Sequence, residues 1–359
     1  MKKLIAAPVA AGVALARSSL GVEGNVAVVG LSPVSLDVAV LDINDGVVQV
    51  ASVGGTTHLG GGDWDERIVA WLVDEFRVRE DVDLLEDPVA GARLREAAER
   101  AREALLSAET TRIEVPYIAF GSGGPKSLDV ELTRSTLDDL TAELVYACRV
   151  PLQQTLDDAG GRRIDHAVLV GRSARMPAFE SLVATETGQE PRKLTAAEIV
   201  AEGACVVAAV RAGEVNDLLL LDVIPLTLAI ELHDGTVLPL IERNTTIPTR
   251  RAVLLAAAGD EQRSTVVHVV EGESGLSAEN RSLGWFELEL QPGGRGDPNI
   301  EVVVDVDAVG TITISATDRP GRITQSMTID EATLADARRE RPSVTGRGLA
   351  AARPSAERA

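Results

Sequence analysis

The sequence has few cysteines and few histidines. Cys148 and Cys205 are its two cysteines, and neither has a second Cys or a His at the spacing of a metal site. The four histidines are scattered along the chain. We therefore expect no metal site, and we interpret both thiols as buried groups that behave like small apolar side chains.

Long apolar runs and positive charge are also scarce. Beyond the N-terminus, no apolar run approaches the ~20 residues that span a bilayer, so the sequence predicts no membrane contact. The formal net charge is -20, and only the tail from Arg338 onward is locally basic. Because such a charge repels phosphate backbones, we expect no nucleic-acid partner.

The first residues, MKKLIAAPVAAGVALARSSLG, have the outline of a secretory signal peptide. Lysines precede an apolar stretch, and Ala-Leu-Ala precedes Arg17. However, Pro8 and Gly12 interrupt the stretch, which consists of Ala and Val rather than Leu. Composition alone leaves export and a helix of the fold equally open.

The remainder of the chain divides into two parts with different sequence patterns. From residue 25 to residue 212 strand-like and helix-like patterns alternate, with strong helices predicted over 60–78 and 93–110, which indicates an α/β organisation. After Glu214 short segments alternate with a period of two, which predicts an antiparallel β-sandwich. From Ala332 onward the composition predicts one short helix and then disorder.

Several stretches occur in an order that is typical of one chaperone family. They are THLGGGDWDERI (57–68), RLREAAERAREALLSAE (93–109), VLVGRSARMP (168–177), DLLLLDVIPLTLAIE (217–231), IERNTTIPTRR (241–251), VVHVVEGE (266–273) and DAVGTITISATD (307–318). On these motifs the chain resembles the DnaK-type chaperones, the bacterial branch of the heat-shock protein 70 family.

The resemblance implies a fold class and four segments. An α/β actin-like partial nucleotide-binding domain, the second lobe, covers residues 1–213, and an interdomain linker covers 214–222. An all-β antiparallel sandwich that binds peptides covers 223–331, and a short helix with a disordered tail covers 332–359. The family's first lobe and its helical lid have no counterpart in the sequence, so we expect the linker leucines to be exposed or packed non-specifically.

The resemblance also bears on the N-terminal segment. KLIAAPVAAGVALA matches an internal helix of the family in register, with Pro8 on the family's proline. This favours a cytoplasmic protein whose first residues belong to the fold over an exported one.

The phosphate-binding part of the family's ATP and Mg site is altered. Ala7 stands where the family has a catalytic glutamate, and GLSPVSLD (Gly30–Asp37) replaces a glycine-rich phosphate loop. Pro33 has no N–H to offer an anion, and the β-branched Val34 is stiff. We therefore expect no catalytic residue, no bound metal and no cofactor in this chain.

The adenosine side retains remnants of the family's pattern. Glu99, Gly171 and Arg175 match the family, and Arg102 conservatively replaces a lysine. Glu103, Leu106 and Arg172 depart from it, since the family has a basic residue, a serine and a glycine at these positions. The simpler interpretation is that Glu99 and Arg102 lie on a solvated helix face and Gly171 ends a strand.

The resemblance carries over a peptide site in the sandwich. Its residues are Ile230, His233, Leu255, Ala258, Thr265 and Val267. The apolar members also fit an ordinary sandwich core. His233 and Thr265 replace apolar residues, and each lowers affinity for Leu-rich peptides by ~1 kcal/mol if a buried polar atom is left poorly paired.

Three functions remain open at this point. We favour a module that binds extended hydrophobic peptide segments without ATP hydrolysis. The first alternative is an ATP-dependent chaperone that acts as part of a split or longer protein, and the second is a fragment without function. The resemblance implies unfolded peptides as partners, together with J-domain and nucleotide-exchange co-chaperones.

Overall fold

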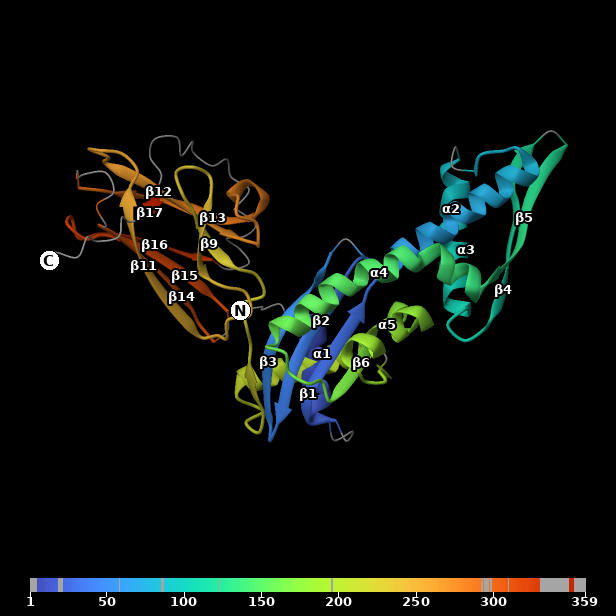
Figure 1. Ribbon diagram of the computed structural model, residues 1–359, viewed down its shortest axis with the longest axis horizontal. Coiled ribbons are helices and arrows are strands. Elements are labelled where there is room, and N and C mark those ends of the chain that lie inside the picture. The colour runs from blue at the N-terminus through green and yellow to red at the C-terminus, as the bar shows by residue number, and fades with distance from the viewer. Residues whose placement is uncertain are drawn as a thin grey trace. The chain divides into compact units, whose positions relative to one another are not determined.

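The computed structural model describes residues 5–18, 22–57, 59–84, 87–121, 123–194, 196–291, 293, 297, 299–308, 310–329 and 349–351. The chain forms two compact units, an N-terminal unit (Leu4–Leu220) and a C-terminal unit that begins at Leu221 (Figure 1). The finer division into four segments stays a prediction. None of the described helices is long and apolar enough to cross a membrane.

The N-terminal unit is built on a six-stranded mixed sheet. Its strand order is β7-β6-β1-β2-β3-β8. The three central neighbours β1, β2 and β3 are antiparallel, whereas β6 runs parallel to β1 and β7 runs parallel to β6. The strands are β1 (Gly24–Leu31), β2 (Leu36–Asn44), β3 (Val47–Thr56), β6 (His166–Val170), β7 (Arg192–Leu194) and β8 (Leu219–Leu221).

Helices cover both faces of this sheet. On one face, α1 (Ala7–Arg17) packs against β1, β2 and α6 (Ala196–Ala212). On the other, Val29 of β1 lies in a buried cluster with residues of α4 (Arg134–Asp158) and α5 (Pro177–Thr187). Every residue of α1 from Pro8 to Leu15 is buried, so the N-terminal apolar stretch is a packed helix of the fold.

The two cysteines differ in their surroundings. Cys148 is buried against the sheet, and this burial raises the pKa of its thiol to about 12. The prediction of a buried thiol was wrong for Cys205, which is exposed. Cys205 lies two residues after Gly203, which faces α1. Because residues two positions apart in a helix point to nearly opposite sides, the Cys205 side chain points away from α1.

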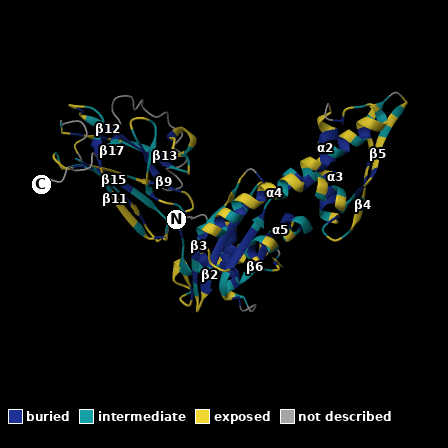
Figure 2. Ribbon diagram, in the orientation of Figure 1, coloured by how far each residue is buried: buried dark blue, intermediate teal, exposed yellow. Residues whose placement is uncertain are grey.

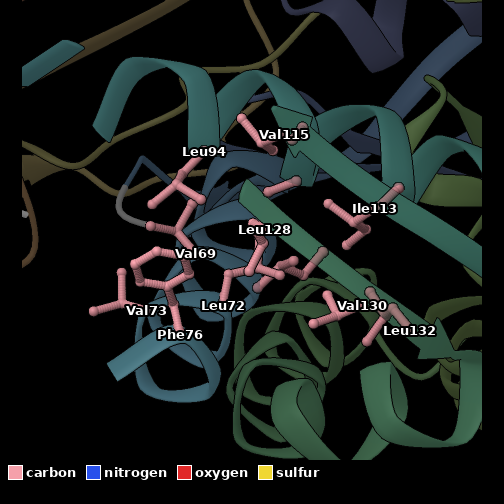
Figure 3. Close-up of a cluster of buried hydrophobic side chains, with 14 of the residues drawn as sticks. Val69, Leu72, Val73, Phe76, Leu94, Ile113, Val115, Leu128, Val130 and Leu132 are labelled. Atoms are coloured by element: carbon pink, nitrogen blue, oxygen red, sulfur yellow. The ribbon is translucent and has the colours of Figure 1, made fainter. Parts of the chain in front are cut away.

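A second core lies at the far end of the N-terminal unit. There α2 (Gly61–Glu80) and α3 (Pro88–Ala104) pack on the hairpin of β4 (Thr110–Gly121) and β5 (Gly124–Thr133), and their apolar side chains meet in Figure 3. The predicted helix over 93–110 was placed too late in the chain, since α3 begins five residues earlier and ends six residues earlier. It begins earlier because Asp87 caps it ahead of a proline at the first helical turn.

The C-terminal unit contains two antiparallel sheets that share one apolar core. Their orders are β10-β9-β12-β13 and β16-β15-β14-β11-β17, and the buried residues lie between them (Figure 2). This confirms the antiparallel pairing predicted from the period-two alternation. The strands are β9 (Leu228–Glu231), β10 (Val237–Ile241), β11 (Thr249–Ala257), β12 (Ser264–Glu271), β13 (Arg281–Glu289), β14 (Ile300–Val306), β15 (Ile312–Asp318), β16 (Ile323–Ile329) and β17 (Leu349–Ala351).

The segment between the units departs from expectation. Its leucines were expected to be exposed or packed non-specifically, and Leu219 is indeed 52% exposed. Leu218, however, is buried, and Leu219–Leu221 form β8 at the edge of the mixed sheet. The Leu219 amide donates to the Gly46 carbonyl at 2.8 Å, and Arg17 pairs with Asp217 at 2.8 Å. The segment pairs there because the edge of β3 would otherwise leave backbone N–H and C=O groups without partners.

The tail also departs from expectation in its described part. The short helix predicted after Ala332 lies outside the described residues. Disorder was predicted at residues 349–351, which instead form β17 and pair with the edge of β11. The backbone hydrogen bonds of that edge and the burial of Leu349 account for the difference.

Candidate functional site

The altered phosphate loop forms a turn that is closed by its own hydrogen bonds. The Ser32 amide donates to the Ser35 carbonyl at 2.9 Å, and the Ser35 amide donates to Ser32 Oγ at 2.9 Å. The Val34 amide also donates to Ser32 Oγ, at 3.2 Å, and the Ser35 hydroxyl donates to Asp37 at 2.7 Å. These amide and hydroxyl donors are therefore already bonded to acceptors within residues 32–37.

The glycines at the start of α2 contact this same turn. The Gly61 amide donates to the Ser32 carbonyl and the Gly62 amide to the Pro33 carbonyl, each at 2.8 Å. A Cβ on Gly60 would lie 2.5 Å from the Val34 nitrogen, so the contact requires glycine there. Helix N-terminal amides commonly bind phosphate, and here protein carbonyls occupy two of them.

Arg102 is held by the protein itself. It lies on α3 with 4% of its surface exposed. Its guanidinium donates to both carboxylate oxygens of Asp65, with Nε to Oδ1 at 2.7 Å and Nη2 to Oδ2 at 3.1 Å, and to Ser173 Oγ at 3.1 Å. Burial raises the pKa of the Asp65 carboxyl, and the Arg102 guanidinium opposes that shift.

The other three nucleotide-site candidates do not form one group of ligand-binding side chains with Arg102. Glu99 is exposed on α3. Gly171 directly follows β6 with φ of 108°, and a Cβ there would lie 2.9 Å from the Leu31 carbonyl oxygen. Arg175 Nε is buried and has no hydrogen-bond partner among the described residues. Arg172, where the family has glycine, pairs with Glu103 at 3.0 Å.

Little space remains beside Arg102. The cavity there, lined by Trp64, Leu106 and Met176 among others, has a volume of about 10 Å³. Such a volume holds about one water molecule. Sequence reasoning missed Asp65 as the partner of Arg102, because the two residues lie on different helices and no sequence spacing indicates that they pair.

The structure brings three of the peptide-site candidates together. Ile230 of β9, Leu255 of β11 and Val267 of β12 lie in one apolar cluster of the C-terminal unit, each with at most 1% of its surface exposed. Thr265 is fully buried on the same strand as Val267, two residues before it. Period-two alternation places both side chains on the same face of β12.

The remaining two candidates follow strand ends. The His233 side chain is exposed, so the penalty expected for a buried imidazole does not apply to it. Its backbone amide instead donates to the Leu349 carbonyl at 2.8 Å. Ala258 is half-buried and follows Ala257, which pairs with Leu349.

A buried polar network fixes the strands that carry this cluster. His268 Nδ1 lies 2.5 Å from Glu231 Oε2, and its Nε2 lies 2.8 Å from Ser282 Oγ. The Ser277 hydroxyl donates to the same Glu231 oxygen at 2.8 Å. The network ties β9, β12 and β13 together on the side opposite Ile230 and Val267.

Comparisons with known proteins agree with these features. A family model described as "Hsp70 protein" matches residues 1–347. The chaperone protein dnaK of Cyanidioschyzon merolae (strain NIES-3377 / 10D) is 44% identical over 306 residues, which are 84% of this chain and 50% of that protein. The chain thus spans about half the length of this relative. Matches of this extent and identity show that the chain belongs to the Hsp70 family.

Proposed function

We propose that the C-terminal unit binds extended hydrophobic peptide segments and that it does so without ATP hydrolysis. The observation that carries the proposal is the β11 edge at Leu255–Ala257, which already pairs with an extended segment whose Leu349 side chain is 0% exposed. Edge pairing supplies backbone hydrogen bonds, and a pocket for one side chain supplies selectivity. Ile230, Leu255 and Val267 form the apolar wall of that pocket.

The N-terminal unit supports the second half of the proposal. We interpret its mixed sheet as the second lobe of an actin-like domain, the part that would hold ATP and Mg in the family. Here carbonyls of Ser32 and Pro33 take the amides of Gly61 and Gly62, and Arg102 is paired with Asp65. Phosphoryl transfer depends on positioned donors and charge, so their engagement elsewhere argues against a working nucleotide site.

A second candidate is an ATP-dependent chaperone in which this chain is part of a longer or split protein. It is favoured by one observation, that the chain covers 50% of the dnaK relative. Under this alternative, peptide affinity responds to ATP once the missing part is supplied. Co-chaperones of the J-domain and nucleotide-exchange classes are proposed partners under either function.

The test is a titration of a fluorescein-labelled Leu-rich heptapeptide with the full chain, followed by anisotropy, in the presence and absence of Mg-ATP. We expect saturable binding that Mg-ATP leaves unchanged. A matched heptapeptide with its central leucine replaced by aspartate should bind at least tenfold more weakly, because a carboxylate in the apolar pocket lacks a partner. Release of the peptide by Mg-ATP would contradict the nucleotide-site part, and absence of binding even after Leu349→Asp would contradict the whole proposal.

A further inference from the structure

We propose that residues 349–351 of the chain occupy its peptide site as an internal competitor, so that the protein lowers its own affinity for external peptides. This inference rests on the proposed function. It assigns a role to a segment that the sequence indicated only as part of a tail.

The first support is backbone pairing on both sides of the segment. On one side β17 runs antiparallel to β11, with Ala257 opposite Leu349 and Leu255 opposite Ala351. On the other side, Leu349 forms a parallel bridge with Leu232, and its carbonyl accepts the His233 amide at 2.8 Å. Leu349 therefore lies between the end of β9 and the end of β11, which belong to different sheets.

The second support is the burial of one anchoring side chain. Leu349 is 0% exposed and lies in the same cluster as Ile230, Leu255 and Val267. Full burial of a leucine contributes about 1.5–3 kcal/mol. The neighbouring Ala350 is only half-buried, as alternation along a strand requires.

The sequence around Leu349 fits the role of a single anchor. Leu349 is the one leucine between residues 335 and 359, and the residues next to it are Gly348 and Ala350. Small neighbours let the backbone approach a strand edge closely. The segment thus presents one large apolar side chain on an extended backbone, the same features that the proposed site selects in an external peptide.

Tethering makes even a weak segment an effective competitor. Leu349 follows Ile329, the end of β16, by 20 residues. Short linkers give effective concentrations in the mM range, so a segment whose isolated Kd is about 100 μM lowers the apparent affinity of an external peptide by about tenfold. The occupied and open forms exchange, and external peptide binds the open form.

The experiment compares the full chain with two variants of equal added charge. Leu349→Asp places a carboxylate in the apolar pocket and should release the segment, whereas Ala356→Asp changes a residue outside β17. Two labelled probes are titrated, the Leu-rich heptapeptide and SVTGRGLAAARPS, the chain's own residues 343–355. We expect Leu349→Asp to bind both probes about tenfold more tightly than the wild type and Ala356→Asp.

Amide hydrogen exchange gives a readout that needs no peptide. The amides of His233 and of Ala256 should exchange faster in Leu349→Asp than in the wild type, while those of β14 and β15 stay protected and show that the unit is folded. Leu349→Ala provides a milder second variant with the same expected direction. Exchange and affinity that are equal in all variants would overturn the self-occupation and leave the proposed function standing. Faster exchange without any peptide binding would overturn both.

Discussion

Arg102→Met should lower the free energy of unfolding of the N-terminal unit by about 3–5 kcal/mol, because it leaves the buried Asp65 carboxylate without its cation. The side chains of Arg102 and Asp65 are 5% and 15% exposed, so water is a poor substitute for the lost partner. Urea unfolding followed by circular dichroism at the helical minimum reports this unit selectively, since every described α-helix lies in it.

The neighbouring pair of the same two helices provides the control. Arg95 of α3 pairs with Glu66 of α2 at 2.6 Å, with both side chains 56% exposed. Arg95→Met should therefore cost less than about 1 kcal/mol. Equal losses in the two variants would contradict the structural role assigned to Arg102.

The penalty of Arg102→Met should depend on pH in a defined direction. Burial raises the pKa of the Asp65 carboxyl, so folding favours its protonated form. Such a group adds stability below its unfolded pKa of about 3.8 and loses that contribution as the pH rises through its folded pKa. The loss caused by Arg102→Met should therefore be largest near pH ~7 and should shrink as the pH approaches ~4, where the carboxyl can be buried neutral.

Gly203→Ala should destabilise the N-terminal unit by about 3 kcal/mol, although alanine is the better helix former. A Cβ on Gly203 of α6 would lie 1.7 Å from the Ala10 carbonyl oxygen of α1. Backbone atoms cannot rotate away as a side chain can, so the two helices must separate. The same urea experiment measures the effect.

An identical change in another helix should have the opposite sign. At Gly91 of α3 a Cβ would meet only the guanidinium end of Arg95, at 3.7 Å. Gly91→Ala should stabilise the unit by about 0.4–1 kcal/mol, because it reduces the entropy of the unfolded chain. If both variants were equally stable, the close approach of α1 and α6 would be refuted.

The secondary structure could largely be predicted because local patterns carry it. Helical spacing of apolar residues predicted α2 and α3, and period-two alternation predicted the strands of the C-terminal unit. Boundaries were less accurate where a cap decides them, as at Asp87. The register of the N-terminal segment with a family helix anticipated α1, whose burial depends on α6 almost 190 residues later and is invisible to local reasoning.

The candidate site was harder to predict because it depends on contacts between distant segments. The character of Pro33 and Val34 indicated an altered phosphate loop, but not that its carbonyls would meet Gly61 and Gly62. In the same way, the apolar residues of the C-terminal unit were identified one by one, whereas the pairing of Leu349 with Ala257 joins residues 92 positions apart. Composition assigned that part of the chain to a tail, since three residues are too few to show a period.

The edge position of β8 has a consequence for proteolysis. Strand β8 covers the edge of β3, and the Leu219 amide bonds to Gly46 at the turn before that strand. A protease that cut ahead of Leu218 would remove this cover and leave the backbone groups of β3 open to strands of other molecules. The N-terminal fragment released by that cut should therefore aggregate. An N-terminal fragment released by a cut after Leu221 keeps β8 as its edge strand and should remain monomeric. The few residues that join the two units thus also protect the sheet against self-association.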